Sequence, residues 1–238
     1  MNIKDKVVYY SYKYNGDYYK VTNAIAKNEE VKKYDIKDNY ITIFDNDYPN
    51  NFKKLRYPPW VIFYKGNISL LNKSCISIVG SRNACEYGVL VTKKIVENNK
   101  NKVVVSGLAK GIDAIAHIEA LKYSGTIGII GSGLSIKYPY CNSFIYDIME
   151  KEQLIISEYP NHVTIKKHHF PFRNRLIASL GECLYVTQAK IKSGTMLTVN
   201  EAINLSKDVY VVPYPLFEKE GEGCNLLISQ GAYILTEL

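Results

Sequence analysis

Short runs of consecutive apolar residues alternate with segments of helical periodicity along most of this chain. Apolar runs of four or so, rich in β-branched residues, are typical of strands buried on both faces. The pattern predicts strands at 40–44, 60–64, 76–79, 103–105, 126–130, 154–156, 184–187, 209–212 and 232–235. It predicts helices at 52–55, 84–97, 112–124, 142–150, 176–180, 193–205 and 225–231.

Strands alternate with helices at least five times, and Gly or Ser follows the C-terminal ends of several strands. This order predicts an α/β fold with a doubly wound, mostly parallel sheet. Residues 1–38, rich in Tyr, Lys and Asn, are too few and too polar for an independent core, so we expect a short helical or irregular N-terminal lead-in. Residues 39–238 then form the main domain. The dinucleotide-binding signature is absent, because Gly80 has no second glycine at the right spacing.

The most informative turn follows the apolar run 76–79. Gly80 ends the run, and Ser81 and Asn83 are good N-cap residues for the helix predicted next. Free backbone N–H groups should collect there, and such turns at the ends of parallel strands bind anions and nucleotides in open α/β sheets. Arg82 lies in the turn itself. The alternative is a helix-capping loop that carries a surface arginine.

Two further glycine-rich loops, 106–111 and 131–134, follow the next strands. Asp113 and His117 stand four positions apart after the first loop, so they share one helix face. They could form a catalytic acid–base pair. A pair that stabilises the helix near its N-terminal dipole is the preferred interpretation.

Composition narrows the class of protein. The 238 residues are 47% hydrophobic, and no apolar run approaches the 18 residues of a membrane span. The N-terminus lacks the apolar core of a signal peptide. The five cysteines are scattered, which predicts a reducing cytoplasm without disulfides or a zinc site.

The net charge of +7 is unevenly spread. Residues 161–192 carry a net +5 and residues 193–238 a net −4, as a face that binds polyanions would require, although a solvated lysine-rich surface would look similar.

The chain holds 26 lysines but only four arginines, at 56, 82, 173 and 175. Arginine offers a planar fork for phosphate or carboxylate that lysine lacks. Structural ion pairs are the competing explanation, and Glu158 is the expected partner of Arg173 or Arg175.

The segment 162–175 interleaves cations with aromatic rings, which suits single-stranded nucleic acid. We expect Phe170 or Phe172 to stack on a base, while burial of both in the core is equally compatible with the sequence. The paired histidines 168 and 169 lack a third ligand at a usable spacing, so we expect no metal site.

Seven motifs in order resemble the DNA-processing protein A (DprA/Smf) family over residues 40–238. They are Ser-Ile-Val-Gly-Ser-Arg (77–82) with Tyr87-Gly88, Ser-Gly-Leu-Ala-Lys-Gly-Ile-Asp (106–113) with Ala116-His117, Gly-Ser-Gly-Leu (131–134) with Tyr138-Pro139, Ser157-Glu158, Phe-Pro-x-Arg-Asn-Arg (170–175), Ser-Gly-Thr (193–195) with Thr198 and Ala202, and Asn225-x-Leu-Ile with Gly231-Ala232.

The resemblance implies an extended Rossmann-like domain that binds single-stranded DNA, protects incoming DNA, and helps to load a RecA-type recombinase during natural transformation and recombination. It also implies a cytoplasmic homodimer without catalytic residues, cofactor or membrane contact. The residues expected to bind DNA are Gly80, Ser81, Arg82, Lys110, Lys137, Lys166, Lys167, His169, Phe170, Phe172, Arg173, Asn174, Arg175, Ser193, Gly194 and Thr195.

The chain departs from the family pattern at Gln188, where many relatives carry Glu, and at Tyr214-Pro215, where a Gly is common. The lead-in is shorter than the helical N-terminal domain of many members, and we expect no C-terminal winged-helix domain.

A nucleotide-cleaving enzyme is the alternative, because residues 193–202 resemble a phosphoribohydrolase signature with Glu201 as the acid. Gln188 removes one carboxylate that such an enzyme could use. A purely structural scaffold is the third possibility, but it leaves the placement of the arginines unexplained.

Overall fold

The structure, a computed structural model, describes residues 2–32 and 36–237, in which nine strands form one sheet. All nine predicted strands are present, with ends shifted by a few residues. They are β1 (Tyr40–Thr42), β2 (Val61–Gly66), β3 (Cys75–Gly80), β4 (Val103–Ser106), β5 (Thr126–Ile129), β6 (Leu154–Ser157), β7 (Cys183–Gln188), β8 (Asp208–Val211) and β9 (Tyr233–Ile234).

The sheet has the order β1-β2-β6-β5-β4-β3-β7-β8-β9. Strands β3 to β9 all run in the same direction. Near one edge β2 runs the opposite way, so it pairs antiparallel with both β6 and β1. Every residue of β4, β5 and β6 is buried, as the continuous apolar runs predict for strands covered on both faces. The mostly parallel α/β sheet predicted from the sequence is therefore confirmed.

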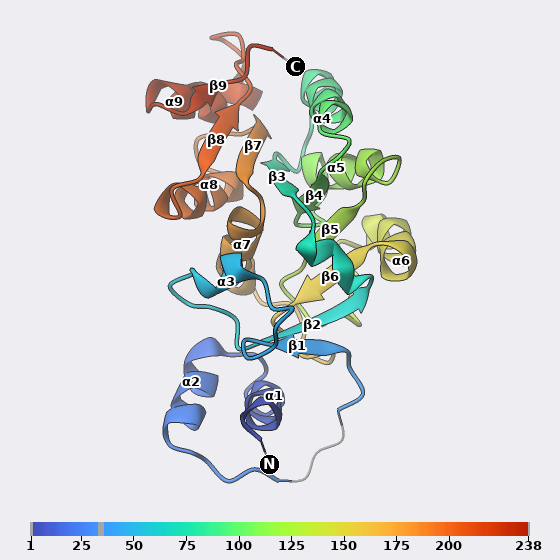
Figure 1. The fold of residues 1–238 in the computed structure, drawn as a ribbon. Coiled ribbons are helices and arrows are strands. Elements are labelled where there is room, and N and C mark those ends of the chain that lie inside the picture. Colours follow the sequence, from blue (N-terminus) through green and yellow to red (C-terminus); the bar gives the residue numbers. More distant parts are fainter. Residues whose placement is uncertain (1, 33–35, 238) are drawn as a thin grey trace.

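Helices cover both faces of this sheet (Figure 1). One face carries α4 (Glu86–Asn98), α5 (Ile112–Ala120) and α6 (Ser143–Glu152), and the other carries α3 (Asn50–Lys53), α7 (His169–Leu180) and α8 (Gly194–Asn204). The helix α9 (Glu222–Ser229) packs near β7 and β8. Short 3₁₀ helices occupy Ile68–Asn72, Tyr140–Asn142 and Lys219–Gly221. In the described residues no helix combines the length and apolar character needed to cross a membrane.

The winding of the sheet reverses at β3, which pairs with β4 on one side and with β7 on the other. The chain leaves β3 and β7 in opposite directions across the sheet, so α4 and α8 lie on opposite faces. Loops that diverge in this way leave a crevice at the C-terminal ends of the two strands, where open α/β sheets bind their ligands.

Two local expectations were wrong. The helix predicted at 176–180 begins earlier, at His169, so the second half of the basic segment 162–175 is helical. Pro171 fits there, since the first turn of a helix needs no N–H from it. The helix α4 is capped by Cys85 rather than by Ser81 or Asn83. The Ser81 hydroxyl instead closes a tight turn with the backbone of Asn83.

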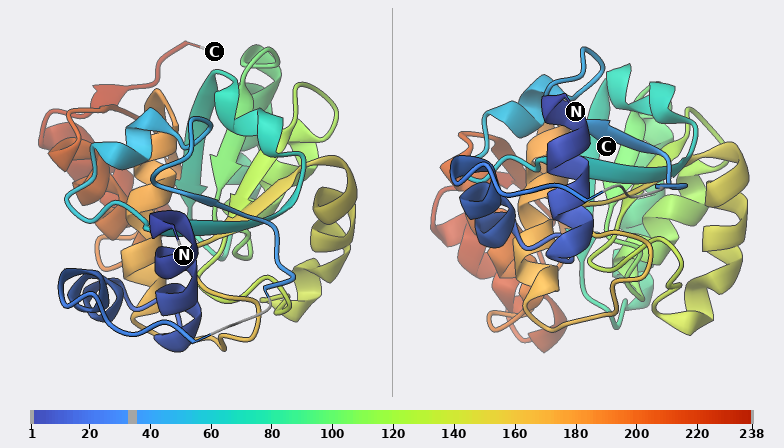
Figure 2. Two further views of the ribbon diagram at one scale, coloured as in Figure 1. Left: turned by 60° about the horizontal axis from the view of Figure 1, so that its bottom comes forward. Right: turned by 90° about the horizontal axis from the view of Figure 1, so that it is seen from below.

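The N-terminal segment forms two helices, α1 (Ile3–Lys13) and α2 (Tyr18–Ala26), which lie beside β1 and β2 (Figure 2). Asn2 and Asp5 make a reciprocal capping box that starts α1. Val7 and Val8 are fully buried against Phe63 of β2, so the segment is packed on the main sheet. Residues 1 and 33–35 of the expected lead-in, and residue 238, lie outside the described residues, and the division at residue 38 stays a prediction.

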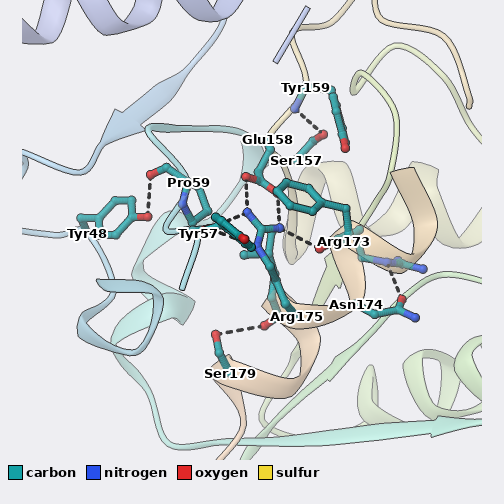
Figure 3. A network of polar contacts seen from close by, with 12 residues as sticks. Tyr48, Tyr57, Pro59, Ser157, Glu158, Tyr159, Arg173, Asn174, Arg175 and Ser179 are labelled. Carbon is teal, nitrogen blue, oxygen red and sulfur yellow. Dashed lines mark hydrogen bonds and ion pairs between the residues drawn. The ribbon is translucent and has the colours of Figure 1, made fainter. Parts of the chain in front are cut away.

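A buried ion pair fixes α7 against the sheet (Figure 3). The Arg175 guanidinium binds both carboxylate oxygens of Glu158, at 2.5 and 2.6 Å, just after the end of β6. It also donates to the carbonyl oxygens of Tyr57 and Phe172, so that it makes five hydrogen bonds in all. The Phe172 ring lies 3.8 Å from the guanidinium carbon. Glu158 is thus the partner that the sequence suggested for one of the two arginines.

We expect Arg175→Lys to lower the free energy of unfolding by about 3 kcal/mol, because a lysine cannot make the bidentate pair and leaves buried acceptors without donors. Urea unfolding at neutral pH measures this. Lys94→Ala is the matched control, since its ion pair with Glu97 is exposed and such pairs contribute less than about 1 kcal/mol. Equal stabilities of the parent and Arg175→Lys would contradict a structural role for Arg175.

Candidate functional site

A cavity of about 660 Å³ opens at the C-terminal ends of β3 and β7. Three segments form it: the turn after β3, the N-terminal half of α7, and the loop that leads from β7 into α8. Ten of the residues expected to bind DNA line this cavity, namely Gly80, Ser81, Arg82, Lys167, Phe170, Arg173, Asn174, Ser193, Gly194 and Thr195. The reversal of winding at β3 therefore brings together motifs that are more than 100 positions apart in the sequence.

The turn after β3 is held by its neighbours. A side chain at Gly80 would place its Cβ within 2.6 Å of Ile112, so only glycine allows this close approach of β3 to α5. The backbone N–H of Ile112 donates to the carbonyl of Ser81 at 3.1 Å. The Gln188 amide donates to the carbonyl of Asn83 at 3.1 Å and accepts from the N–H of Cys85 at 2.9 Å.

Arg82 projects from this fixed turn into the cavity. Its side chain is exposed and, in the part of the chain that the structure describes, has neither a hydrogen bond nor an ion pair. It contacts the Phe170 ring, whose centroid is 6.0 Å from the guanidinium carbon. A fork-shaped cation and an aromatic ring thus stand side by side, free to bind a ligand.

The start of α8 forms the opposite wall. The first backbone N–H groups of a helix have no intrahelical acceptor, and Gly194 leaves open space around them. Ser193 also lines this wall, and its hydroxyl oxygen is buried without a hydrogen-bond partner among the described residues. Thr195 donates to the carbonyl of Gly80 at 3.1 Å and so ties this wall to the turn. Such a helix start is suited to an anion.

The cavity is strongly cationic. Arg82, Lys167, Lys190 and Lys192 line it, all are exposed, and none forms an ion pair within the described residues. The only acid in the described lining is Asp113, which is buried. Unpaired charges of one sign around a concave surface raise the local concentration of an oppositely charged ligand.

Sequence reasoning missed several lining residues. Asn83, Tyr138, Lys190 and Lys192 line the cavity but were not among the expected contacts. The two lysines directly follow the buried strand β7 and precede the Ser-Gly-Thr motif. Their position at the end of a central strand was the signal that could have identified them.

Six expected residues do not line the cavity. Lys110 and Lys166 are exposed elsewhere, and Lys137 pairs with Asp147 and Glu150 on α6. His169 is buried, where its Nδ1 donates to the carbonyl of Gly131 at 2.9 Å. The other two are half-buried Phe172 and buried Arg175, which contact each other and help to fix α7.

The loop after β4 forms part of the cavity floor, and Asp113 and His117 hold it. The Asp113 carboxylate accepts from the N–H groups of Gly107 and Ala109, at 3.1 and 3.4 Å. His117 Nε2 accepts from the N–H of Leu108 at 3.3 Å, which leaves the ring proton on Nδ1 for Thr126 at 2.6 Å. The two side chains therefore bind the loop separately. They form neither an acid–base pair nor a helix-stabilising pair.

The same loop is held through its carbonyl groups. Arg173 donates to the carbonyls of Gly107, at 2.9 Å, and Ile129, and Asn142 donates to those of Leu108 and Ala109, each at 3.0 Å. Leu108 has a φ of +57°, a left-handed conformation that leucine keeps only where its surroundings impose it. Arg173 thus lies beneath the cavity as a support for its floor, although it also contributes to the lining.

Burial shifts the pKa values of these supporting groups. Desolvation, assisted by the nearby Arg173 charge, lowers the pKa of His117 to about 3, so the ring is neutral at physiological pH. Desolvation raises the pKa of Asp113, while the Arg173 charge and the two N–H donors oppose that shift. Asp113 is bound to the loop, and His117 is bound to the loop and to Thr126 of β5.

Glu201, the acid that a phosphoribohydrolase would use, lies on α8 but does not line the cavity. Gln188 uses both ends of its amide to hold the turn after β3. Among the described residues, no group of three or more His, Cys, Asp or Glu side chains could hold a metal ion.

This chain is similar in sequence to proteins of one known family. The family described as DNA recombination-mediator protein A matches residues 39–238. The chain is 38% identical over 197 residues to the DNA processing protein DprA of Streptococcus pneumoniae, which covers 82% of this chain and 70% of that protein. It is 40% identical over 198 residues to DprA of Bacillus subtilis, with coverage of 82% and 67%.

Solved structures agree with the sequence relatives. The X-ray structure of DprA from Streptococcus pneumoniae matches with a TM-score of 0.82 at 36% identity, covering 84% of this chain and 72% of that chain. A structure of DNA processing protein A from Helicobacter pylori matches with a TM-score of 0.77 at 30% identity, covering 84% and 93%. That study describes a single-stranded DNA binding mode of the Helicobacter protein.

The lowered pKa of His117 makes stability depend on pH in a definite direction. The unfolded chain binds a proton at His117 below about pH 6.5, whereas the folded protein does so only near pH 3, so stability is complete above pH 6.5 and falls between these values. We expect the free energy of unfolding of the parent to fall more steeply in this window than that of His117→Gln, by up to about 1.4 kcal/mol per pH unit. Urea unfolding of both proteins from pH 7 to pH 4 measures the difference, and parallel slopes would show that His117 is charged in the folded state.

Proposed function

The chain belongs to the DNA recombination-mediator protein A family, and on that basis we propose that it binds single-stranded DNA in the cavity between β3 and β7. The proposal is carried by four exposed cations beside the Phe170 ring that form no ion pair among the described residues, namely Arg82, Lys167, Lys190 and Lys192. Phosphates need cations and unpaired bases need rings, and both are available here within one cavity.

Each wall has a role in this proposal. The N-terminus of α8, with the hydroxyl of Ser193, binds a phosphate, and Arg82 binds the same or the next phosphate with its two-pronged donor group. A base stacks on Phe170. Stacking on a ring in a cavity requires a base outside a duplex, which favours single strands. The single-stranded DNA binding described for the Helicobacter relative supports this choice.

The wider role is also part of the proposal. As a member of a recombination-mediator family, the protein protects incoming single strands in the cytoplasm and hands them to a RecA-type recombinase, without catalysing a reaction itself. A nucleotide-cleaving enzyme of related fold is the alternative. The absence of Glu201 from the cavity lining, and the structural use of Gln188, favour binding over cleavage.

We further propose that the protein is a homodimer. The loop between β8 and α9 exposes two large apolar side chains, Leu216 at 88% and Phe217 at 96%. Tyr87 and Leu90 of α4 are also exposed, and Tyr87 packs against Tyr214 at the base of this loop. Adjacent apolar side chains exposed to this extent are typical of an interaction surface, and a second copy of the chain would cover it.

Binding to single-stranded oligonucleotides should depend strongly on salt. If four to six phosphates are contacted, the logarithm of affinity should fall against the logarithm of salt concentration with a slope of roughly −3 to −4. Fluorescence anisotropy at several salt concentrations measures this.

We expect Arg82→Lys to lose about 1 kcal/mol of binding free energy and Arg82→Ala about 2 kcal/mol, because lysine keeps the charge but loses the second hydrogen bond.

Lys137→Ala is the matched control, because Lys137 is already paired with acids on α6 and lies outside the cavity lining. We expect it to bind like the parent. A flat salt response, a preference for duplex DNA, or parental binding by both Arg82 variants would reject the site. Release of free base from a nucleoside monophosphate by the parent would favour the enzyme instead.

The dimer proposal makes a separate prediction. We expect sedimentation of the parent to show a dimer at micromolar concentration, and Phe217→Asp to show a 27 kDa monomer, because a carboxylate there would be buried without a partner. The substitution should leave the monomer folded, since the Phe217 side chain is 96% exposed within the described residues. A parent that sediments only as a monomer would remove the proposal.

A further inference from the structure

One of the four arginines has no role in the site described so far. Arg82 lines the cavity, Arg173 supports its floor and Arg175 fixes α7, but Arg56 does none of these. Its side chain is exposed and has no hydrogen bond or ion pair within the described residues. Its guanidinium carbon lies 5.1 Å from the centroid of the Tyr57 ring, within the range of a cation–π contact.

Arg56 borders a continuous group of aromatic rings. Tyr57 contacts Tyr18 and Tyr19 of α2, with ring centroids 5.4 and 5.5 Å apart, and contacts Phe172 of α7 at 6.2 Å. We call Tyr18, Tyr19, Arg56, Tyr57 and Phe172 the aromatic surface. Tyr19 is its outermost ring, with 56% of its area exposed. A soluble protein has little reason to leave such a ring uncovered beside an unpaired arginine unless it meets a partner.

The charge around the aromatic surface fits a polyanion. Lys20 follows Tyr19 directly, and Lys53 and Lys54 precede Arg56 by a few positions. All three lysines are exposed and, like Arg56, form no ion pair in the described parts of the chain. Exposed rings among unpaired cations are the combination that binds single strands, because each base has a face to stack and each nucleotide has a phosphate.

The aromatic surface is continuous with the cavity through α7. Phe170 and Phe172 are two positions apart, so they point to nearly opposite sides of the helix. Phe170 faces Arg82 in the cavity, and Phe172 faces Tyr57. Figure 2 shows α2 beside α7 in both views. A strand that leaves the cavity has to cross only the first turn of one helix, about 10–12 Å wide, where Lys167, His168 and Pro171 are exposed.

We propose that the aromatic surface is a second contact for single-stranded DNA. The strand leaves the cavity across the N-terminal turn of α7, a base stacks on Tyr19, and Arg56 binds the adjoining phosphate. This inference rests on the proposed function of the cavity. The contact uses Tyr18 and Tyr19, which precede the part of the chain that matches the family, residues 39–238.

The length of the oligonucleotide separates the two contacts. Oligothymidylates of about 6 and about 20 nucleotides bracket the site sizes usual for such proteins, so only the longer one should reach both surfaces. We expect Tyr19→Ala and Arg56→Ala to bind the short strand like the parent and the long strand at least about fivefold more weakly. For the long strand, Arg56→Ala should also reduce the salt slope by about one, because one phosphate contact is lost.

Matched controls lie at the opposite end of the strands. Lys100 and Tyr123 are an exposed lysine and an exposed tyrosine that precede β4 and β5, away from the cavity, so Lys100→Ala and Tyr123→Ala should bind both lengths like the parent. If Tyr19→Ala lowers the melting temperature, Arg56→Glu replaces it in the experiment, because the Arg56 side chain is exposed. Reversal of this charge should weaken binding of the long strand more than Arg56→Ala does.

The outcomes distinguish the two proposals. If the Tyr19 and Arg56 variants match the parent on both lengths while Arg82→Ala weakens both, the aromatic surface is not a contact and the cavity proposal stands. If the Tyr19 and Arg56 variants weaken both lengths equally, the residues act through the cavity and the second contact is rejected. If the parent binds neither length, the proposed function itself fails and the second contact fails with it.

Discussion

The reversal of winding at β3 determines where the cavity and the segments that line it lie. Because β4 pairs with one side of β3 and β7 with the other, the loops after β3 and β7 diverge and leave space between them. That space cannot be filled by either loop, and it is bounded by the start of α8 and by a turn that glycine alone permits. The fold therefore produces a crevice bordered by a helix N-terminus, a setting suited to anions, before any side chain is considered.

The arginines show how one residue type serves both architecture and binding. Arg175 and Arg173 are buried. Arg175 donates to the Glu158 carboxylate and to main-chain carbonyls, and Arg173 donates to main-chain carbonyls after β4 and at the end of β5. Arg82 and Arg56 are exposed and unpaired among the described residues. Burying a cation requires that its hydrogen-bond donors be satisfied within the protein, so the buried pair fixes α7. The exposed arginines are solvated, so they need no hydrogen-bond acceptor within the protein and are available to a ligand.

The sequence predicted the sheet and the turn at Gly80 because both leave local signals, continuous apolar runs and a glycine at a strand end. It missed the start of α7, because Pro171 and the paired histidines resemble a loop until the first-turn position of the proline is known. The role of Arg173 could not be foreseen, since its acceptors are carbonyl groups 66 and 44 positions away. Any residue supplies a carbonyl, so such partners leave no trace in the sequence, whereas Glu158 could be suggested for Arg175 because it is an acid.

The loop 107–109, with six of its backbone groups held by Asp113, His117, Arg173 and Asn142, also bears on how fast a ligand can be captured. A floor whose backbone groups are held by six hydrogen bonds has little ordering entropy to lose when a strand binds as proposed. Encounter is then governed by diffusion in the field of the exposed cations, and the salt concentration acts mainly on the association rate constant. Residence time depends instead on the stacking and hydrogen bonds formed after arrival. Under the proposed function, capture and release of a strand are therefore controlled by different groups of the protein.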